Sequence, residues 1–352
     1  MPEHWPHAAE FTAETLYLNT ASMGLPPRAT QEALRVAHAG WAAGRLQPPD
    51  FDAAITDARA AYARLVGVDP STVAVGHQVS PFVGLVAAAV PDGAEVLVAE
   101  GEFTSVTFPF AAHADRSVQV VEVPLADLPE RVGPDTAWVA VAAVQSADGA
   151  LADLAALEAA CARHGADMLL DLTQASGWLP VDASRFAVTV CGCYKFLLSP
   201  RGTAFLTVRP DVTDRLRPLA AGWFAGEDPW ASIYGLPLRL APDARRFDVS
   251  PAWFDWVGTA ASLDFLLGVG RDALHAHALE VAAAFSHAAD LPEPGSAILA
   301  LATDDAVPDL LAAHDVVAAQ RAGRLRVSFH VHNTVDEVTP LGAALRGHVR
   351  PG

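Results

Sequence analysis

Lysine is nearly absent from this chain of 352 residues. Lys195 is the only lysine, and every other member of the 23 lysine and arginine residues is an arginine. Lys195 stands among apolar residues, and Asp171 lies one predicted strand away, at the end of the apolar run 168–170, so the lysine amine is predicted to have a chemical role. The alternative is a buried ion pair between the two residues that only holds strands together.

Cysteine is scarce as well. Cys161, Cys191 and Cys193 are the three cysteines, and their spacing is not that of a disulfide framework, which fits a reducing compartment such as the cytoplasm. Two cysteines separated by one glycine, without partner ligands, make a poor metal site. We therefore expect a cytoplasmic protein that holds no metal.

Long apolar runs are missing. No run reaches the length of a membrane span, although 52% of the residues are hydrophobic and the mean hydropathy is +0.25. The opening residues, MPEHWPHAAEF, lack the basic segment and apolar core of a signal peptide. Positive charge is in deficit too, because 41 acidic residues outnumber 23 basic ones. The net charge of −18 argues against nucleic acid or an anionic membrane as partner, but a local arginine can still bind a small anion.

The strongest pattern lies between residues 168 and 208. Three apolar runs in this segment have the length of buried strands: 168–170, 187–190 and 203–208. Neighbouring parallel strands present the residues at their carboxyl ends along one edge of a sheet. We therefore expect Asp171 and Lys195 to meet at such an edge.

The first part of the chain adds helices and a possible anion site. Helical periods run from about residue 30 to 43 and from about 51 to 65. A short strand ends at Gly76, and Ser80–Pro81 predicts a helix with Ser80 as its N-cap and Pro81 as its first residue. The free backbone N–H groups of a helix start attract phosphate. On these residues alone, an ordinary capped helix is an equal alternative.

Several motifs together resemble the cofactor-binding core of the class V aminotransferase family. They are Asp171-x-x-Gln174, Pro180–Val181–Asp182, Tyr194–Lys195, Pro200–Arg201–Gly202, YLNTASMG at 17–24, RFDVSP at 246–251 and RLRVSFHVHNTVDEV at 324–338. Members of this family are fold-type I enzymes that use pyridoxal 5′-phosphate (PLP). The resemblance implies an α/β fold, with a mostly parallel seven-stranded sheet in a large domain and a small C-terminal α+β domain. We expect an N-terminal arm at 1–16, the large domain at 17–251 and the small domain at 252–352.

The resemblance also implies roles for single residues. Lys195 carries the Schiff base, and Asp171 pairs with the pyridine nitrogen, whose proton makes the ring an electron sink. Phe103 stacks on the ring. The other implied cofactor contacts are Val79, Ser80, Ser146, Gln174, Tyr194 and Ser250. The implied substrate contacts are Asn19, Ala21 and Arg326, with Arg326 on the carboxylate and Arg321 as a second candidate.

Ser250 stands where relatives place a threonine that reaches the PLP phosphate of the partner subunit. The resemblance therefore implies a homodimer with shared active sites and a small amino-acid substrate. The segment 218–242 is rich in aromatic residues, glycine and proline, and reads as a long loop. It lines either a substrate pocket or a dimer interface, and the sequence favours neither.

The motifs leave the reaction open. Desulfurases of this family need an acceptor cysteine, and HDVVAAQRAG at 314–323 has none, so a cysteine desulfurase is not expected. Phe103 and Tyr194 favour a β-lyase that cleaves a C–S bond or, as kynureninases do, a C–C bond. An aminotransferase and an amino-acid epimerase are the alternatives within the family. A catalytically silent protein of the same fold is the alternative from another class.

Overall fold

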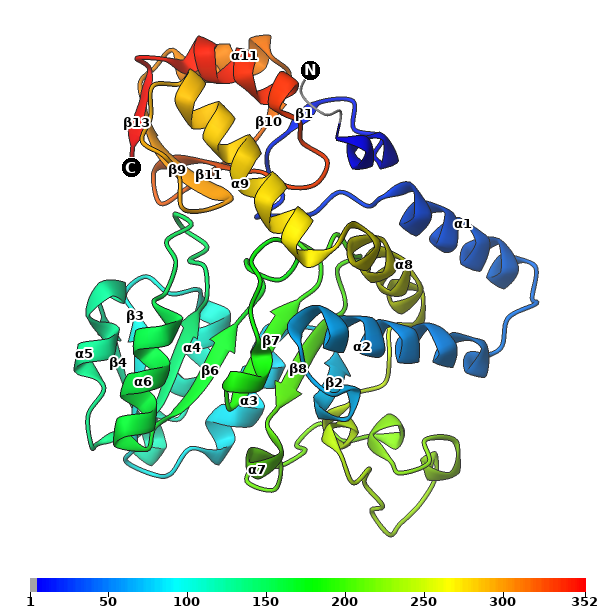
Figure 1. Cartoon of the computed structure of the whole chain (residues 1–352). Helices are drawn as coiled ribbons and strands as arrows, with labels where there is room; N and C mark the ends of the chain where they lie inside the picture. Colours follow the sequence, from blue (N-terminus) through cyan, green and yellow to red (C-terminus); the bar gives the residue numbers. More distant parts are fainter. Residues whose placement is uncertain (1–4) are drawn as a thin grey trace.

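The computed structural model describes residues 5–352. At its centre is a seven-stranded sheet in the order β2-β8-β7-β6-β5-β3-β4 (Figure 1). Strand β8 runs antiparallel to both of its neighbours, and the remaining pairs are parallel. The expected mostly parallel seven-stranded sheet is confirmed. Its strands are β2 (Val73–Gly76), β3 (Glu95–Ala99), β4 (Gln119–Val123), β5 (Thr136–Ala142), β6 (Asp167–Asp171), β7 (Val188–Gly192) and β8 (Ala204–Val208).

The sheet is the middle of three layers. Successive side chains of a strand point to opposite faces, so both faces of this apolar sheet must be covered. In β3, Leu97 belongs to the core on one face, and Val96 and Val98 belong to the core on the other. The first core includes α2 (Asp52–Val66), α6 (Leu154–His164) and α8 (Trp253–Val269), whereas the second includes α3 (Val79–Ala89) and α4 (Thr104–Ala111).

A small lobe lies beside one edge of the sheet, at the top of Figure 1. It contains an antiparallel sheet in the order β11-β12-β9-β13, which confirms the expected small α+β unit. Near the start of the chain, β1 (Leu16–Tyr17) pairs with β10 (Val316–Val317). The other elements here are α9 (Arg271–Ala288), β9 (Ile298–Thr303), α10 (Val307–Ala313), β11 (Ala319–Arg321), β12 (Arg324–Ser328), α11 (Val335–Leu345) and β13 (Val349–Pro351).

The division of the chain into an arm and two domains stays a prediction. Helix α8 begins just after the expected boundary at 251, yet it packs against α2 and α1 (Arg28–Ala42) in the sheet lobe. Helix α9 then continues from α8 toward the small lobe (Figure 1). None of the helices in residues 5–352 combines the length and apolar character that crossing a membrane requires.

The predicted start of the helix after β2 is wrong. Helix α3 begins at Val79 with Gln78 as its N-cap, so Ser80 and Pro81 both lie in the first turn. The first four N–H groups of a helix have no partner within it, and a proline at the third position therefore costs no hydrogen bond. The helix can start two residues earlier than the Ser-Pro signal indicates.

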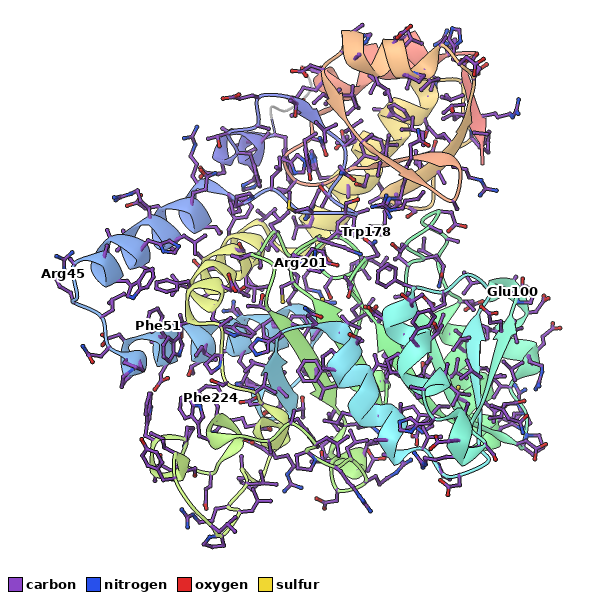
Figure 2. All side chains as sticks on the ribbon, turned by 180° about the vertical axis from the view of Figure 1, so that it is seen from behind. Arg45, Phe51, Glu100, Trp178, Arg201 and Phe224 are labelled. Carbon is purple, nitrogen blue, oxygen red and sulfur yellow. The ribbon has the colours of Figure 1, made fainter. Side chains whose placement is uncertain are left out.

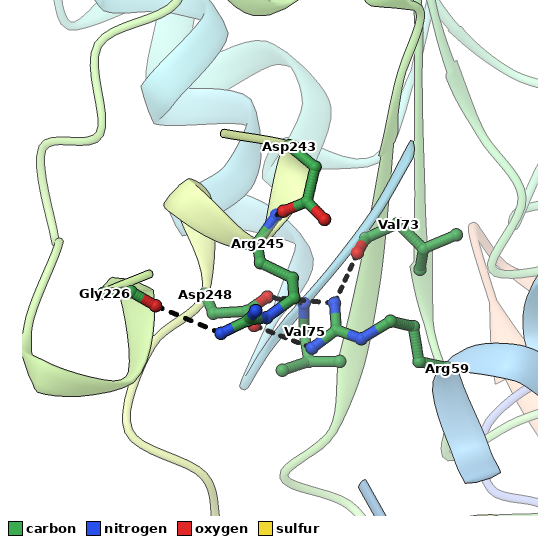
Figure 3. Close-up of polar contacts among 7 residues, drawn as sticks. All are labelled: Arg59, Val73, Val75, Gly226, Asp243, Arg245 and Asp248. Atoms are coloured by element: carbon green, nitrogen blue, oxygen red, sulfur yellow. Dashed lines mark hydrogen bonds and ion pairs between the residues drawn. The ribbon is translucent and has the colours of Figure 1, made fainter. Parts of the chain in front are cut away.

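A buried ion pair fastens the segment after the 218–242 loop to the sheet (Figure 3). Arg59 of α2 donates to Asp248 from Nη2 at 2.7 Å and from Nη1 at 3.2 Å, and the N–H of Val75 in β2 donates at 2.8 Å. Asp248 is fully buried, and this burial raises its pKa although Arg59 opposes the shift. Three donors compensate the buried carboxylate, which joins α2, β2 and the chain before Ser250.

Three buried histidines in the small lobe hydrogen-bond to the backbone, and the bond of His330 connects this lobe with the loop that carries Lys195. Each places its Nε2 against a backbone carbonyl oxygen: His330 on Phe196 at 2.8 Å, His332 on Tyr17 at 3.1 Å and His277 on Asn333 at 2.9 Å. A carbonyl only accepts, so Nε2 carries the proton in each ring. Burial lowers the pKa of His330 to about 3 and the pKa of His332 and His277 to about 4.

We expect these histidines to make the fold sensitive to acid. In the unfolded chain the histidines take up protons from about pH 6.5 downward, whereas in the folded chain they stay neutral until about pH 4. Their contribution to the free energy of unfolding is therefore complete above about pH 6.5 and is lost as the pH falls from about 6.5 to about 4. Urea unfolding between pH 7 and pH 4 measures the slope. His277→Gln should flatten it, whereas the exposed His287→Gln on the same helix should not. Equal slopes in both variants would contradict the assignment.

Candidate active site

A cavity of about 150 Å³ lies where strands β2, β3, β5, β6 and β7 end. The carboxyl ends of parallel strands share one edge of a sheet, so the loops that follow them converge there. The cavity is lined by His77, Gln78, Val79, Phe103, Ser105, Ala142, Ser146, Asp171, Thr173, Gln174, Gly192, Tyr194, Lys195, Arg201 and Thr203.

Many of the residues predicted for the site meet at this cavity. Those in its lining are Val79, Phe103, Ser146, Asp171, Gln174, Tyr194 and Lys195. Among the described residues, Ser80, Ser250, Asn19, Ala21 and Arg326 are outside the lining. Position alone assigns no role, so the cofactor and substrate contacts stay predictions.

Lys195 and Asp171 are both buried, each only 5% exposed. Burial lowers the pKa of the Lys195 amine to about 8; Asp171 opposes this shift, and Arg326 and Arg321 add to it. Burial also raises the pKa of Asp171, against the donors of Thr173 and the charge of Lys195. The lowered pKa increases the neutral fraction of the amine, which is the form that attacks a carbonyl carbon.

The backbone around Lys195 is held by contacts from distant parts of the chain. A Cβ atom at Gly24 would lie 2.1 Å from the carbonyl oxygen of Lys195. A Cβ at Gly177, which has a φ of 108°, would lie 2.1 Å from the carbonyl oxygen of Phe196. That same oxygen accepts the hydrogen bond from His330. Any side chain at either glycine would displace the loop that carries the lysine.

Two aromatic rings flank the amine. The Nζ atom of Lys195 lies 5.2 Å from the ring centroid of Phe103 and 5.6 Å from that of Tyr194. Phe103 is the N-cap residue of α4, and Tyr194 follows the end of β7. The guanidinium carbon of Arg201 lies 5.2 Å from the Tyr194 ring. The Phe103 ring can stack on a planar ligand but cannot transfer a proton.

A buried carboxylate, that of Glu102, holds the backbone of Phe103 in place. Glu102 accepts hydrogen bonds from the N–H of Phe103 at 2.7 Å, the N–H of Ala142 at 2.8 Å and Nε2 of Gln145 at 2.8 Å. Burial raises the pKa of Glu102, and these donors oppose the shift. The sequence shows only an acidic residue in a loop, so this support for the ring was not predicted.

The predicted substrate residues connect to the cavity through Gln174 and Ser146. Nε2 of Gln174 donates to the carbonyl oxygen of Ala21 at 3.0 Å and to the hydroxyl of Ser146 at 2.9 Å. Arg326, 2% exposed, donates from Nη1 to the carbonyl oxygen of Ser146 and from Nη2 to the hydroxyl of Ser22 at 2.7 Å. Arg326 therefore lies directly behind the cavity wall.

Several lining residues were not identified from the sequence. Thr173 lies within the Asp171-x-x-Gln174 motif and Thr203 follows Gly202 of another motif, whereas His77 follows β2 and borders none of the motifs. Thr173 donates its backbone N–H to Asp171 at 2.8 Å, and its hydroxyl accepts from the N–H of Gly192 at 2.9 Å. The sequence does contain one signal for Thr173: a residue two positions after an aspartate commonly donates its N–H to that carboxylate.

Ser250 is exposed, and its hydroxyl accepts a hydrogen bond from Nε1 of Trp223 at 3.3 Å. In the 218–242 loop, Tyr234 and Leu236 are each 89% exposed. The loop lies at the far end of the sheet lobe from the small lobe (Figure 1). In the view from behind in Figure 2, Phe224 of this loop is well separated from Arg201. The homodimer with shared active sites stays a prediction.

Comparison with known proteins gives a consistent family. The profile described as "Aminotransferase class-V" matches residues 48–290. The chain is 28% identical over 302 residues to an uncharacterised aminotransferase of Bacillus subtilis, covering 80% of both chains. It is 29% identical to the isopenicillin N epimerase of Streptomyces clavuligerus, covering 75% of this chain and 72% of the relative. It is also 29% identical to the kynureninase of Deinococcus radiodurans, covering 79% and 72%.

Solved structures show the same fold. A complex of the cystine C–S lyase C-DES with its product cysteine persulfide has a TM-score of 0.85 and 21% identity, covering 96% of this chain and 98% of the other. A C-DES variant with glycine covalently linked to its PLP cofactor has a TM-score of 0.86 and 21% identity, covering 97% and 100%. These likenesses confirm the expected fold-type I architecture.

We expect Glu102→Gln to destabilise the protein by about 1–3 kcal/mol. The carboxylate accepts hydrogen bonds from backbone N–H groups on both of its oxygens, and the NH2 group of glutamine would face one of these donors. Urea unfolding at pH 7 measures the change. Glu100→Gln is the matched control, since Glu100 is exposed in the same loop. A Glu102→Gln variant as stable as Glu100→Gln would show that this carboxylate does not support the Phe103 loop.

Proposed function

The chain belongs to the class V aminotransferase family, and from this premise we propose that it is a β-lyase that cleaves a C–S or C–C bond in an amino acid. It is a PLP-dependent enzyme of the lyase and transferase type. The narrower assignment as a lyase rests on the groups around Lys195. An aminotransferase and an epimerase are the alternatives that the experiments below distinguish.

The cavity fits PLP in its donors and acceptors. Oε1 of Gln174 is buried and has no hydrogen-bond partner within residues 5–352, so it can accept from a ligand hydroxyl. Asp171 would hold the proton of the pyridine nitrogen, and Phe103 would cover the ring. The donors available for a phosphate are the side chains of His77, Gln78, Thr203 and Arg201 in the lining and the first turn of α3.

When bound, PLP supplies an electron sink for negative charge that develops at the Cα atom of an amino acid. The residues of this chain then have separate tasks. Arg326 would bind the substrate carboxylate with its guanidinium group. Lys195, in its neutral form, would remove the proton from Cα. Asp171 would hold the pyridine nitrogen by a hydrogen bond, and the buried walls would exclude water from the reacting atoms.

The observation that carries the lyase proposal is the Phe103 ring, whose centroid lies 5.2 Å from the lysine amine. An epimerase that works with two bases needs a proton donor on the face of Cα opposite Lys195. The side chain of Phe103 has no proton to donate, so proton transfer at Cα falls to Lys195 alone. Elimination or cleavage at Cβ requires only one such group.

The cysteines support the expectation that the chain is not a desulfurase. Cys161 is 5% exposed, and Cys191 and Cys193 are fully buried. Burial raises the pKa of Cys161 to about 11 and that of Cys193 to about 12. The attacking form of cysteine is the thiolate, and these environments disfavour it. An acceptor for sulfur would therefore have to come from another molecule.

Lys195→Ala should abolish the visible absorbance of bound PLP, because the chain has no other lysine side chain to form a Schiff base. Borohydride reduction of the wild-type enzyme, followed by peptide mapping, should place the cofactor on the peptide with Lys195. A Lys195→Ala protein that stays coloured would contradict the Schiff-base assignment. A wild-type protein that stays colourless with added PLP would support a catalytically silent protein.

A panel of amino acids and S-conjugates should distinguish the reactions. We expect release of a 2-keto acid and ammonia, or of alanine after C–C cleavage, without any added keto acid. An aminotransferase would instead stop after one turnover until a keto acid is supplied. An epimerase would change the optical rotation of the amino acid without releasing a product. Either of these last two results would overturn the lyase proposal.

A further inference from the structure

Two arginines converge on one hydroxyl group beside the cavity. The Nη2 atom of Arg326 lies 2.7 Å from Oγ of Ser22, and the Nη2 atom of Arg321 lies 3.3 Å from the same oxygen. Arg326 is buried on β12, whereas Arg321 is exposed at the end of β11. Ser22 belongs to the loop after Asn19, close to the predicted substrate contacts.

Neither guanidinium group has an acidic partner. Within residues 5–352, no carboxylate oxygen lies within 4.0 Å of Arg321 or Arg326, whereas Arg59, Arg131 and Arg209 each form an ion pair. Other described arginines, such as Arg28 and Arg201, also lack an ion pair, so the distinguishing feature is that two unpaired guanidinium groups meet at one hydroxyl. Two adjacent cations that meet only neutral oxygens form a site whose charge is not balanced by the protein.

We propose that Arg321 binds a second anionic group of the substrate, so that the enzyme prefers amino acids with an acidic side chain such as a carboxylate or sulfinate. This inference rests on the proposed function, in which Arg326 binds the α-carboxylate. Arg321 is then the residue that determines specificity for the group at or beyond Cβ. It is not required for the chemistry at Cα.

The charges favour two anions over one. An α-carboxylate at Arg326 neutralises one of the two positive charges, and the guanidinium of Arg321 stays beside it without a counter-ion. The two guanidinium groups share the hydroxyl of Ser22, and Arg321 adds to the effect of burial in lowering the pKa of Arg326 to about 10. Arg321 also lowers the pKa of Lys195, so its charge reaches the reaction centre. A dianionic ligand would relieve both repulsions at once.

The location also suits a side chain that leaves the cavity toward solvent. Arg326 contacts Ser146 in the cavity wall, and Ser22 lies between the buried and the exposed arginine. A substrate whose carboxylate is held at Arg326 can extend its side chain past Ser22 to Arg321. The hydroxyl of Ser22 can donate to either anion, because it now only accepts from the two guanidinium groups.

The test is calorimetric binding of two unreactive ligands to the PLP-loaded enzyme at about 0.15 M ionic strength. Succinate carries two carboxylates, and succinamate has nearly the same shape with one carboxylate replaced by an amide. We expect succinate to bind at least about fivefold more tightly than succinamate. Arg321→Gln should bring this ratio close to one and change succinamate binding little. Arg326→Gln should weaken both ligands.

Arg324→Gln is the matched control, because Arg324 pairs with Arg321 across the β11–β12 hairpin but has no contact with Ser22 among the described residues. It should keep the wild-type ratio. A wild-type ratio near one, no binding of succinate at millimolar concentration, or an unchanged ratio in Arg321→Gln would each overturn the inference. Binding needs no turnover, so these results are separate from the amino-acid panel. An enzyme that cleaves neutral amino acids with a ratio near one would refute only the role of Arg321.

Discussion

The active site depends on the burial of the Lys195 amine, whose positive charge Asp171 compensates only in part. Lys195 and Asp171 are equally inaccessible, and burial shifts the pKa of each toward its neutral form. Such a pair is expensive for a fold to maintain, so the surrounding backbone has to be rigid. The close approaches of Gly24 and Gly177 and the bond from His330 provide that rigidity. Residues near both ends of the chain thus fix the position of a group in its middle.

The architecture explains why the two lobes cannot be treated separately. The small lobe supplies His330 to the lysine loop and Arg326 to the cavity wall, and the N-terminal loop supplies Gly24 and Ser22. At the edge strand β2, the Arg59–Asp248 pair fastens the chain that leads to Ser250. A change at His330 or Gly24 would therefore displace the loop that carries Lys195.

The sequence was informative where chemistry coincides with the end of an apolar run. Asp171 ends β6 and Lys195 follows β7, so strand pattern and residue type point to the same edge. It was less informative for contacts made across the fold. Nothing local indicates that Glu102 holds the Phe103 loop or that Ser22 joins two arginines. The Ser80–Pro81 signal misplaced the start of α3, because proline within a first helical turn does not mark the first residue.

The solitary lysine has a consequence for the outer surface. With Lys195 inside the cavity and the three cysteines buried, the described surface offers neither a lysine amine nor a thiol to electrophiles. Electrophiles that modify lysine would find their one target only by entering the active site. Because the chain has no other lysine, any lysine modification of this protein would be a modification of its active site.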